Sequence, residues 1–321
     1  MAVAGGTCGN VLSVLSYLNW HCSAVGYLGE DSAGSIVADD LRRSGVHSRH
    51  LKRRGDTQTP VFVQQLTSDA TGRPRHTFIS KCPQCGSTLT SKSAHSTPIR
   101  KFPTAECPDV FFMDRLSDDI LALAESAKAH GATVYYEPSA KDDAALWEEA
   151  FKTVDIVKYS ADRFTAEELE PYTSAAKSLW EVQTLGEKGL RYRRHVVKEA
   201  VKGWKTSRAI SAPRVVDTCG AGDWCSAGLL YDLIAQGERR ATDESFAHAV
   251  RFGQVLAAWA CAFVGARGAM YANTPSETWN ALNQIAEGRP VDMKIWPTAR
   301  ATQTGSRKLP YCGTAICAEP K

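Results

Sequence analysis

Short apolar runs alternate with longer stretches of helical periodicity along most of this chain. The runs that predict strands are residues 22–28, 110–113, 133–136, 156–158 and 182–185. Helical spacing of apolar residues is found at 10–18, 33–43, 118–130, 144–153, 166–169, 172–180, 222–235 and 248–264. Strands that alternate with helices are typical of right-handed βαβ units. We therefore expect an α/β domain built around a mostly parallel central sheet.

Two further segments have the character of β-hairpins. Residues 61–66 and 75–79 are rich in β-forming residues and are separated by a polar turn, and residues 191–210 are similar. After residue 287 the periodicity disappears, so that residues 288–321 are predicted to form a tail that needs something other than a core to hold it. The expected organisation is one domain, residues 1–287, followed by this tail.

Composition narrows the class of protein. In 321 residues, 38 Lys and Arg against 35 Asp and Glu leave a net charge of +3, which argues against a protein that coats nucleic acid. The longest apolar run, residues 255–266, is shorter than the roughly 20 residues of a membrane span. The start lacks the charged region of a signal peptide, because the first basic residue is Arg42. We expect a cytoplasmic protein without a nucleic-acid or membrane partner.

The segment Asp217-Thr218-Cys219-Gly220-Ala221-Gly222-Asp223 is the sharpest chemical signal. It follows two valines and precedes an apolar helix, so its glycines permit a tight turn and its backbone amides form an anion site at the helix start. A carboxylate in that first turn can accept a proton from a hydroxyl, as phosphoryl transfer requires. A dinucleotide fingerprint fails because position 225 is Cys. An ordinary strand–turn–helix junction is the remaining alternative.

With this segment the chain resembles the PfkB, or ribokinase-like, family of carbohydrate and nucleoside kinases. The family signature D-T-x-G-A-G-D matches residues 217–223. Its early Gly-Gly turn with Asn matches residues 5–10, and its V-G-x-x-G-x-D-x-x-G stretch matches residues 25–34. T-L-G-x-x-G is found at residues 184–189 and a late G-A-x-G-A loop at residues 265–269. The resemblance covers residues 5 to about 287 and implies a three-layer α/β/α fold.

The resemblance also implies roles for residues at the matching positions. Asp223 is expected to be the catalytic base, and the backbone of Gly220, Ala221 and Gly222 the anion hole for the transferred phosphoryl group. The expected substrate-binding residues are Gly6, Asn10 and Asp31, and the expected nucleotide-binding residues are Thr184, Gly186, Gly189, Gly265 and Gly268. Asp31 is equally compatible with a turn-forming role. ATP and Mg²⁺ are the implied cofactors.

A lid inserted at about residues 47–100 is also implied, with the hairpin at 61–79 closing over the acceptor. Such lids often pair between subunits, which makes a homodimer an expectation. From its own position Asp114 is a further candidate for the acceptor site, because it follows the strand at 110–113 and ligands bind at the carboxyl ends of parallel strands. A salt bridge is the alternative for Asp114.

Two departures from the family pattern affect the functional expectation. Only four residues precede the Gly-Gly turn, where the family has a strand that carries an acidic residue for the acceptor. Where the family has Asn-x-x-Glu, the element that orders Mg²⁺ and phosphates, this chain has Ser160-Ala161-Asp162-Arg163. The favoured function is ATP-dependent phosphorylation of a hydroxyl on a sugar, sugar derivative or nucleoside. The alternative is a non-catalytic member that binds a nucleotide or sugar as a sensor or scaffold.

Ten cysteines remain to be explained. Cys82-Pro83-Gln84-Cys85-Gly86 has the form of a zinc knuckle, and Cys312 with Cys317 in the tail can complete a tetrahedral site that ties the tail to the lid. His95 and Cys107 are alternative ligands, while a disulfide or unligated thiols are the other possibilities for Cys82 and Cys85. With the basic aromatic run 191–194 the knuckle also suggests zinc-dependent nucleic-acid binding, which the small net charge disfavours.

Overall fold

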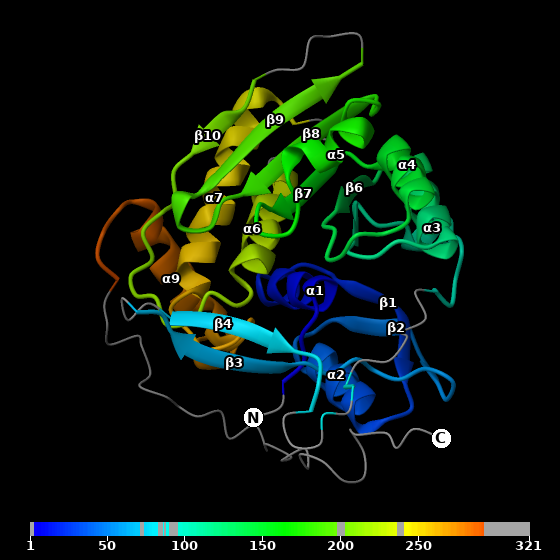
Figure 1. Ribbon diagram of the computed structural model, residues 1–321, viewed down its shortest axis with the longest axis horizontal. Coiled ribbons are helices and arrows are strands. Elements are labelled where there is room, and N and C mark those ends of the chain that lie inside the picture. Colours follow the sequence, from blue (N-terminus) through cyan, green and yellow to red (C-terminus); the bar gives the residue numbers. More distant parts are fainter. Residues whose placement is uncertain are drawn as a thin grey trace. The chain divides into compact units, whose positions relative to one another are not determined.

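A computed structural model describes residues 3–70, 74–82, 86, 88–89, 96–197, 203–235 and 241–291 (Figure 1). The chain forms two compact units. The first unit contains residues 1–94, 211–227 and 255–321, and the second contains residues 95–210 and 228–254. Helices α6 (Ala221–Ala235) and α7 (Asp243–Ala260) each contribute residues to both units.

The second unit is built on a six-stranded sheet. Its strand order is β10-β9-β8-β7-β6-β5, with bounds Lys205–Ser207, Leu190–Val196, Ser178–Thr184, Ile156–Ser160, Thr133–Tyr136 and Val110–Met113. Strands β5 to β8 are parallel, whereas β9 pairs antiparallel with β8 and β10 antiparallel with β9. The α/β class and the mostly parallel sheet are therefore confirmed, and residues 191–210 supply the expected second hairpin.

Helices cover both faces of this sheet. Successive side chains of a strand point to opposite faces, so neighbouring residues pack against different helix layers. On one face Val157, Tyr159 and Leu179 join a buried core with Trp147 and Phe151 of α4. Helices α3 (Asp118–Ala129), α4 (Ala144–Thr153) and α5 (Ala166–Thr173) supply that layer. On the other face Trp180 stacks on Phe246 of α7 with ring centroids 3.9 Å apart. The second unit thus has the three layers that the family resemblance implies.

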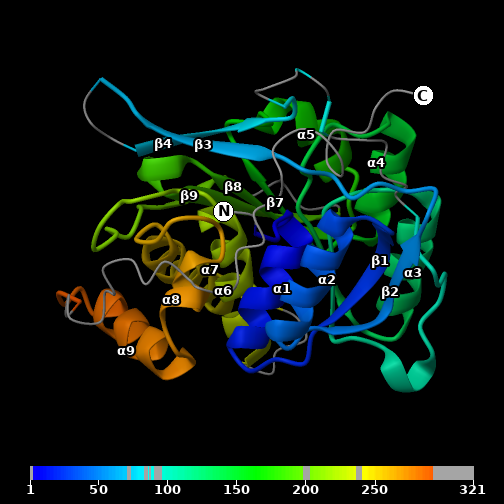
Figure 2. The same cartoon turned by 90° about the horizontal axis from the view of Figure 1, so that it is seen from below.

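The first unit combines a small parallel pair of strands with helices and a separate hairpin (Figure 2). Strands β1 (Ser23–Gly29) and β2 (His47–Arg54) pair in parallel, beside helices α1 (Thr7–Tyr17) and α2 (Ser32–Arg43). Strands β3 (Val63–Ser68) and β4 (Pro74–Ile79) form the expected antiparallel hairpin, called the lid hairpin below. Helices α8 (Gly268–Ala272) and α9 (Pro275–Ala286) come after α7, beyond the loop of residues 265–268, which is called the second loop below.

Two helix predictions are wrong in extent. At residues 172–180 the structure ends α5 at Thr173 and begins β8 at Ser178, because Leu179 and Trp180 enter opposite layers as strand neighbours do. The helix expected at 248–264 is α7, which begins at Asp243 behind reciprocal hydrogen bonds between Thr242 and Ser245 and ends at Ala260.

Strand β2 and helices α8 and α9 were not expected. Strand β2 carries mostly basic residues, so its sequence shows no apolar run. Helix α9 does carry a start signal, since Thr274 and Glu277 form a capping box and Pro275 occupies the first helical position. The tail beyond residue 291 lies outside the described residues, so the boundary at residue 287 stays a prediction. Within the described part of the chain, no helix is both long and apolar enough to cross a bilayer.

Candidate functional site

The loop of residues 217–222 leads into helix α6 and packs tightly on the loop of residues 265–268. Gly220 has φ +79°, and a Cβ there would lie 2.5 Å from the Cα of Ala266, so that only glycine fits. The indole Nε1 of Trp224 donates to the carbonyl of Ala266 at 2.9 Å. These contacts fix the start of α6 against the second loop within the first unit.

Asp217 ties the two loops and the lid hairpin together. Its carboxylate is 1% exposed and accepts hydrogen bonds from the amides of Cys219 (2.9 Å) and Gly265 (2.8 Å). A third bond comes from Nε2 of Gln64 on β3, also at 2.9 Å. A buried carboxylate with three donors is a structural anchor. Asp217 therefore organises the loop and does not need a ligand to satisfy it.

His76 of strand β4 makes a second contact between the lid hairpin and this loop. Its Nδ1 lies 3.1 Å from the hydroxyl of Thr218 and 3.6 Å from Oδ1 of Asp217. Gln64 and His76 thus come from the two strands of the hairpin; both contact Asp217, and His76 also contacts Thr218. The lid hairpin is in this way held on the residues that immediately precede the expected anion hole.

Asp223 lies in the first turn of α6 and is partly buried. Its Oδ2 accepts a hydrogen bond of 2.6 Å from Nδ2 of Asn10 on helix α1. The first amides of a helix have no carbonyl partner within the helix, and the helix dipole makes that end favourable to anions. The first turn of α6 therefore places a carboxylate beside backbone donors, which is the arrangement that transfer of a phosphoryl group to a hydroxyl requires.

The predicted substrate-binding residues of the first unit have structural contacts. Gly6 starts helix α1 with φ +91°, and its carbonyl accepts from the amide of Asn10. Asn10 is 4% exposed and bonded to Asp223. Asp31 caps helix α2, and its two carboxylate oxygens accept from the amides of Gly34 (2.6 Å) and Thr59 (2.8 Å). These bonds favour the turn-forming alternative for Asp31.

The remaining predicted residues of the first unit, Gly265 and Gly268, shape the second loop. Gly265 has φ +80° and donates its amide to Asp217, as described above. A Cβ on Gly268 would lie 2.9 Å from the Cβ of Phe263, so a side chain has no room there. Both glycines therefore have backbone reasons to be present, and their expected proximity to the adenine stays a prediction.

Thr184, Gly186, Gly189 and Asp114 belong to the second unit. Gly189 has φ +98°, and a Cβ there would lie 2.3 Å from the carbonyl oxygen of Ser207, so the turn between β8 and β9 requires glycine. The carbonyl of Asp114 accepts from the hydroxyl of Ser139 at 2.9 Å. The nucleotide role of the turn and the acceptor role of Asp114 stay predictions.

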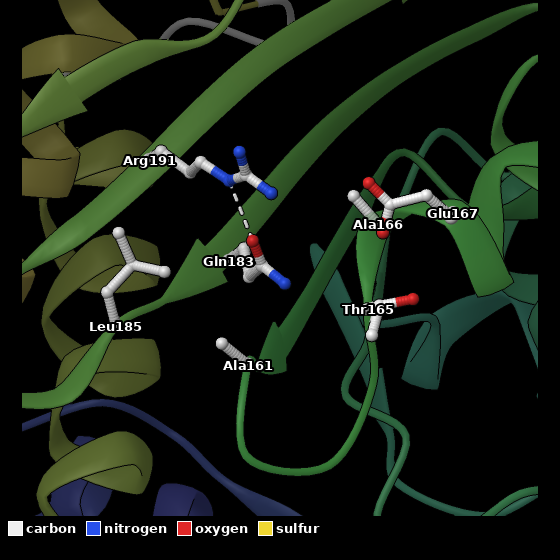
Figure 3. Close-up of a pocket in the computed structure, with 7 residues that line it drawn as sticks. All are labelled: Ala161, Thr165, Ala166, Glu167, Gln183, Leu185 and Arg191. Atoms are coloured by element: carbon white, nitrogen blue, oxygen red, sulfur yellow. Dashed lines mark hydrogen bonds between the residues drawn. The ribbon is translucent and has the colours of Figure 1, made fainter.

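A cavity of about 380 Å³ lies beside the β8–β9 turn (Figure 3). It is lined by Ala161, Thr165, Ala166, Glu167, Gln183, Leu185 and Arg191. Nε of Arg191 donates to Oε1 of Gln183 at 2.7 Å, and Figure 3 shows the rest of the guanidinium directed into the cavity. This cavity adjoins the segment Ser160–Arg163, where both Asp162 and Arg163 are exposed.

The residues present fit a phosphate group and a hydrated Mg²⁺ in different degrees. The start of α6 favours an anion because a helix N-terminus carries backbone donors and the positive end of the helix dipole, although the amide of Ala221 already donates to the carbonyl of Thr218 at 3.2 Å. Mg²⁺ usually keeps several waters and takes one or two carboxylates plus phosphate oxygens, and in the second unit the exposed Asp162 is a carboxylate of the kind it takes. Among the described residues no group of three or more His, Cys, Asp or Glu is arranged to hold a metal by itself.

The proposed zinc ligands are described only in part. Cys82 is buried, and the amide of Gly86 donates to its carbonyl at 2.9 Å, with Gly86 at φ +73°. Cys85, Cys312 and Cys317 lie outside the described residues, as does His95. The zinc site therefore stays a prediction.

Three residues of this site were not found from the sequence. Gln64 and His76 belong to no recognisable motif. The alternation of side chains along a hairpin shows which residues share a face, but it does not show which other part of the protein that face contacts. Arg267 is the variable position of the G-A-x-G-A loop and is 2% exposed, which no spacing rule predicts for an arginine.

Burial of Cys219, with the nearby carboxylates of Asp217 and Asp223, raises the pKa of its thiol to about 12.

The chain is similar to known carbohydrate kinases over most of its length. Residues 2–273 match the profile of the pfkB family carbohydrate kinases. Fructokinase-2 of Solanum lycopersicum is 26% identical over 249 residues, which is 72% of each chain. Fructokinase-2 of Oryza sativa subsp. japonica is 24% identical over 275 residues, covering 79% of this chain and 78% of its own.

Solved structures with the same fold have more distant sequences. Arabidopsis thaliana ribokinase, complexed with ribose and ATP, superposes with a TM-score of 0.63 at 19% identity and covers 88% of each chain. Vibrio cholerae O395 fructokinase, in its fructose, ADP and calcium ion bound form, gives 0.60 at 20% identity, covering 84% of this chain and 89% of its own. These two likenesses establish the ribokinase-like fold.

Proposed function

This chain belongs to the pfkB family of carbohydrate kinases, and we propose that Asp223 is the base with which it phosphorylates a hydroxyl of a sugar, sugar derivative or nucleoside. The protein is an ATP-dependent carbohydrate kinase. The observation that carries the proposal is the carboxylate of Asp223 in the first turn of α6, beside the backbone donors of the helix start.

In the proposed reaction each group has one task. Asp223 accepts the proton of the acceptor hydroxyl as its oxygen forms a bond to the γ-phosphorus of ATP, and ADP leaves. The amides of residues 220–222 stabilise the negative charge on the transferring group. Mg²⁺, when bound, would neutralise phosphate charge, with Asp162 as a candidate protein ligand acting through water. The lid hairpin, held on Thr218 and Asp217, keeps water out of the acceptor site.

The acceptor class is proposed from the relatives' names and the lid. Fructose, ribose and inosine are bound by solved members of this fold, so a small polyol or a nucleoside is the acceptor we propose.

Phe62 and Phe78 of the lid region are each 53% exposed and touch edge to face. Exposed aromatic side chains next to open strand edges support the proposal of a homodimer formed through the lid.

One observation favours the second candidate function, nucleotide or sugar binding without catalysis. Arg163 stands exposed where the family has a carboxylate near the phosphates, and a cation there cannot ligate Mg²⁺. ATP binding without transfer to any acceptor is the outcome that this function requires. The zinc site of Cys82, Cys85, Cys312 and Cys317 is an additional proposal, which fails if purified reduced protein contains no zinc.

The test measures ADP release with Mg-ATP and a panel of acceptors that includes fructose, ribose and inosine. We expect one class of acceptor to be turned over and Asp223→Asn to lower kcat by about 10²–10⁴-fold, the usual contribution of a positioned base. Arg163→Glu is the companion variant, and a gain in kcat would show that the altered element limits turnover. Unchanged turnover by Asp223→Asn would exclude Asp223 as the base.

A further inference from the structure

Arg267 lies at the inner end of a chain of buried polar contacts that leads to Asp223. Its Nε donates to Oδ1 of Asn10 at 2.9 Å, and Nδ2 of the same amide donates to Oδ2 of Asp223 at 2.6 Å. Arg267 is 2% exposed and Asn10 is 4% exposed, so water does not compete for these bonds. All three residues belong to the first unit.

The amide of Asn10 can present either its donor or its acceptor to a neighbour, and the two orientations have opposite effects on a carboxylate. An arginine has only donors, so the bond from Nε fixes Oδ1 toward Arg267 and therefore Nδ2 toward Asp223. We propose that Arg267 is a positioning residue of the kinase reaction, which clamps Asn10 so that its N–H holds the carboxylate of Asp223. This inference rests on the proposed role of Asp223 as the base.

The other end of Arg267 explains why a lysine cannot replace it. Nη1 forms a close ion pair with Asp40 of helix α2, and the hydroxyl of Tyr271 donates to both carboxylate oxygens of Asp40 at 2.9 and 3.0 Å. The planar guanidinium therefore donates to Asp40 and Asn10 at once from fixed positions, whereas an ammonium on a flexible stem does not hold two partners in this geometry.

The cost of this arrangement points to a role beyond stability. Nη2 of Arg267 is buried without a hydrogen-bond partner among the described residues, and a buried unsatisfied donor costs about 1–3 kcal/mol. A Cβ on Gly9 would lie 3.0 Å from Nη2, so the glycine beside Asn10 leaves room for the guanidinium. Buried ion pairs often stabilise a fold no better than apolar residues of the same size. Holding Asn10 is the task that only the arginine performs.

The chemical effect follows from which form of Asp223 the clamp favours. A hydrogen bond donated to a carboxylate stabilises its ionised form, and only that form can accept the proton of the acceptor hydroxyl. The bond also limits rotation of the carboxylate, which keeps its oxygens aligned in the active geometry. Without the clamp the amide can rotate, and its carbonyl oxygen then faces Asp223 and favours the protonated acid.

The experiment compares wild type, Arg267→Lys and Arg267→Met for kcat, KM for ATP and the pH profile of kcat/KM. We expect kcat to fall by about 10²-fold in both variants, the size of effect that a misplaced catalytic group produces. The acid limb of the profile should move to higher pH, and KM for ATP should change little. Millimolar guanidinium should restore part of the activity of Arg267→Ala, whereas ammonium should not.

Matched variants separate this role from loss of fold. Arg42→Met removes another arginine of the first unit, whose ion pair with Asp39 is exposed, and should leave kcat and the pH profile unchanged. Asn10→Asp keeps an acceptor for Arg267 but removes the donor to Asp223, so it should reproduce the shifted acid limb even if Arg267→Met does not fold. Thermal unfolding measures the folded fraction of each variant.

Two results overturn the inference. One is an Arg267→Lys protein with wild-type kcat, and the other is activity that falls only with the folded fraction while the acid limb stays in place. Asp223→Asn distinguishes a wider failure. If it retains turnover, the proposed base is wrong; if it is inactive while the Arg267 and Asn10 variants behave as wild type, only the clamp is wrong.

Discussion

Asp223 in the first unit and Glu181 in the second are both carboxylates held by side chains, yet their surroundings differ. Glu181 is 0% exposed, and its Oε1 accepts from the hydroxyl of Tyr159 at 2.5 Å. Its Oε2 accepts from Nε of Arg193 at 2.7 Å and lies 2.6 Å from Nε2 of His195. Asp223 is only partly buried and stands at a helix start, where Asn10 holds one of its oxygens.

The difference separates a structural carboxylate from a chemical one. Burial by itself raises the pKa of Glu181, but the bonds from His195, Arg193 and Tyr159 outweigh that effect and lower its pKa below the usual value. A carboxylate that is sealed and bonded in this way cannot meet a substrate, and its removal would leave its partners buried without a counter-charge. A carboxylate that remains partly accessible beside backbone donors can take part in a reaction. Whether a carboxylate can take part in a reaction therefore depends on its access to a substrate, which Asp223 has and Glu181 lacks.

The largest expected effect comes from removing the sealed carboxylate. Glu181→Leu leaves Arg193 and His195 without their buried partner, and we expect the free energy of unfolding to fall by about 3–5 kcal/mol. Activity per folded molecule should remain close to wild type. Urea unfolding followed by fluorescence and ADP-release assays measures the two quantities.

Asp223→Asn is the matched variant for that comparison. It should unfold at nearly the wild-type urea concentration while its turnover is lost. The distinction between the two carboxylates fails if Glu181→Leu is as stable as wild type, or if the stability of the two variants falls equally.

A smaller effect should be visible in acid, with the same cluster as its source. Because the pKa of Glu181 is lowered in the folded protein, its contribution to stability is complete above the unfolded value, about 4.5, and is lost as pH falls through the folded value. The stability difference between wild type and Glu181→Gln should therefore be largest near neutral pH and shrink below about pH 4.5. Urea unfolding at pH 7, 5 and 4 measures it, and a difference that grows in acid contradicts the assignment.

The sequence predicted the position of Asp223 but not the buried cluster around Glu181. The Asp223 motif was found because glycines, a threonine and two acids at fixed spacing before a helix favour a tight turn into an anion-binding helix start over an ordinary strand–turn–helix junction. Glu181 gave no such signal, because it lies within an apolar strand and its partners come from β7 and β9. Cross-strand partners depend on register, which the sequence of one strand does not determine.

The same reasoning explains which elements were missed. The strands β6 and β7 were predicted with their bounds nearly right, because both faces of a central parallel strand are buried and its apolar run is continuous. Strand β5 lies at the edge of the sheet, and its bounds were also predicted because its four residues are all apolar. Residues 178–180 were misplaced in a helix, since Leu179 and Trp180 suit either structure until their opposite layers are known. Arg267 was unpredictable as a buried residue, because its partners Asn10 and Asp40 are more than two hundred residues away in the chain.

The hydrogen bond between Gln64 of the lid hairpin and Asp217 gives a further prediction, with an expected effect of moderate size. Gln64→Met removes one neutral donor from the buried carboxylate of Asp217, a bond worth about 1.5–3 kcal/mol because its acceptor is charged. We expect KM for the acceptor to rise by about tenfold, since the lid hairpin loses one of the two side chains, Gln64 and His76, described above as contacting the loop. Gln65→Met is the matched control on the same strand, because Gln65 is exposed. Equal KM values for the two variants would show that the lid does not act through Asp217.

The smallest effect concerns Cys219, which shares its loop with Asp217 and precedes Gly220. Its pKa of about 12, raised by burial and then by the carboxylates of Asp217 and Asp223, leaves about one thiolate in 10⁴ molecules at pH 8. We therefore expect iodoacetamide to modify Cys219 far more slowly than it modifies a free thiol such as N-acetylcysteine, with a rate that is still rising at pH 10, where the rate for the free thiol has levelled off. Peptide mass spectrometry after timed alkylation measures this rate. Cys219→Ser should retain activity, because the bond to Asp217 comes from the backbone amide, and rapid alkylation with loss of turnover would instead place a reactive thiolate beside the anion site.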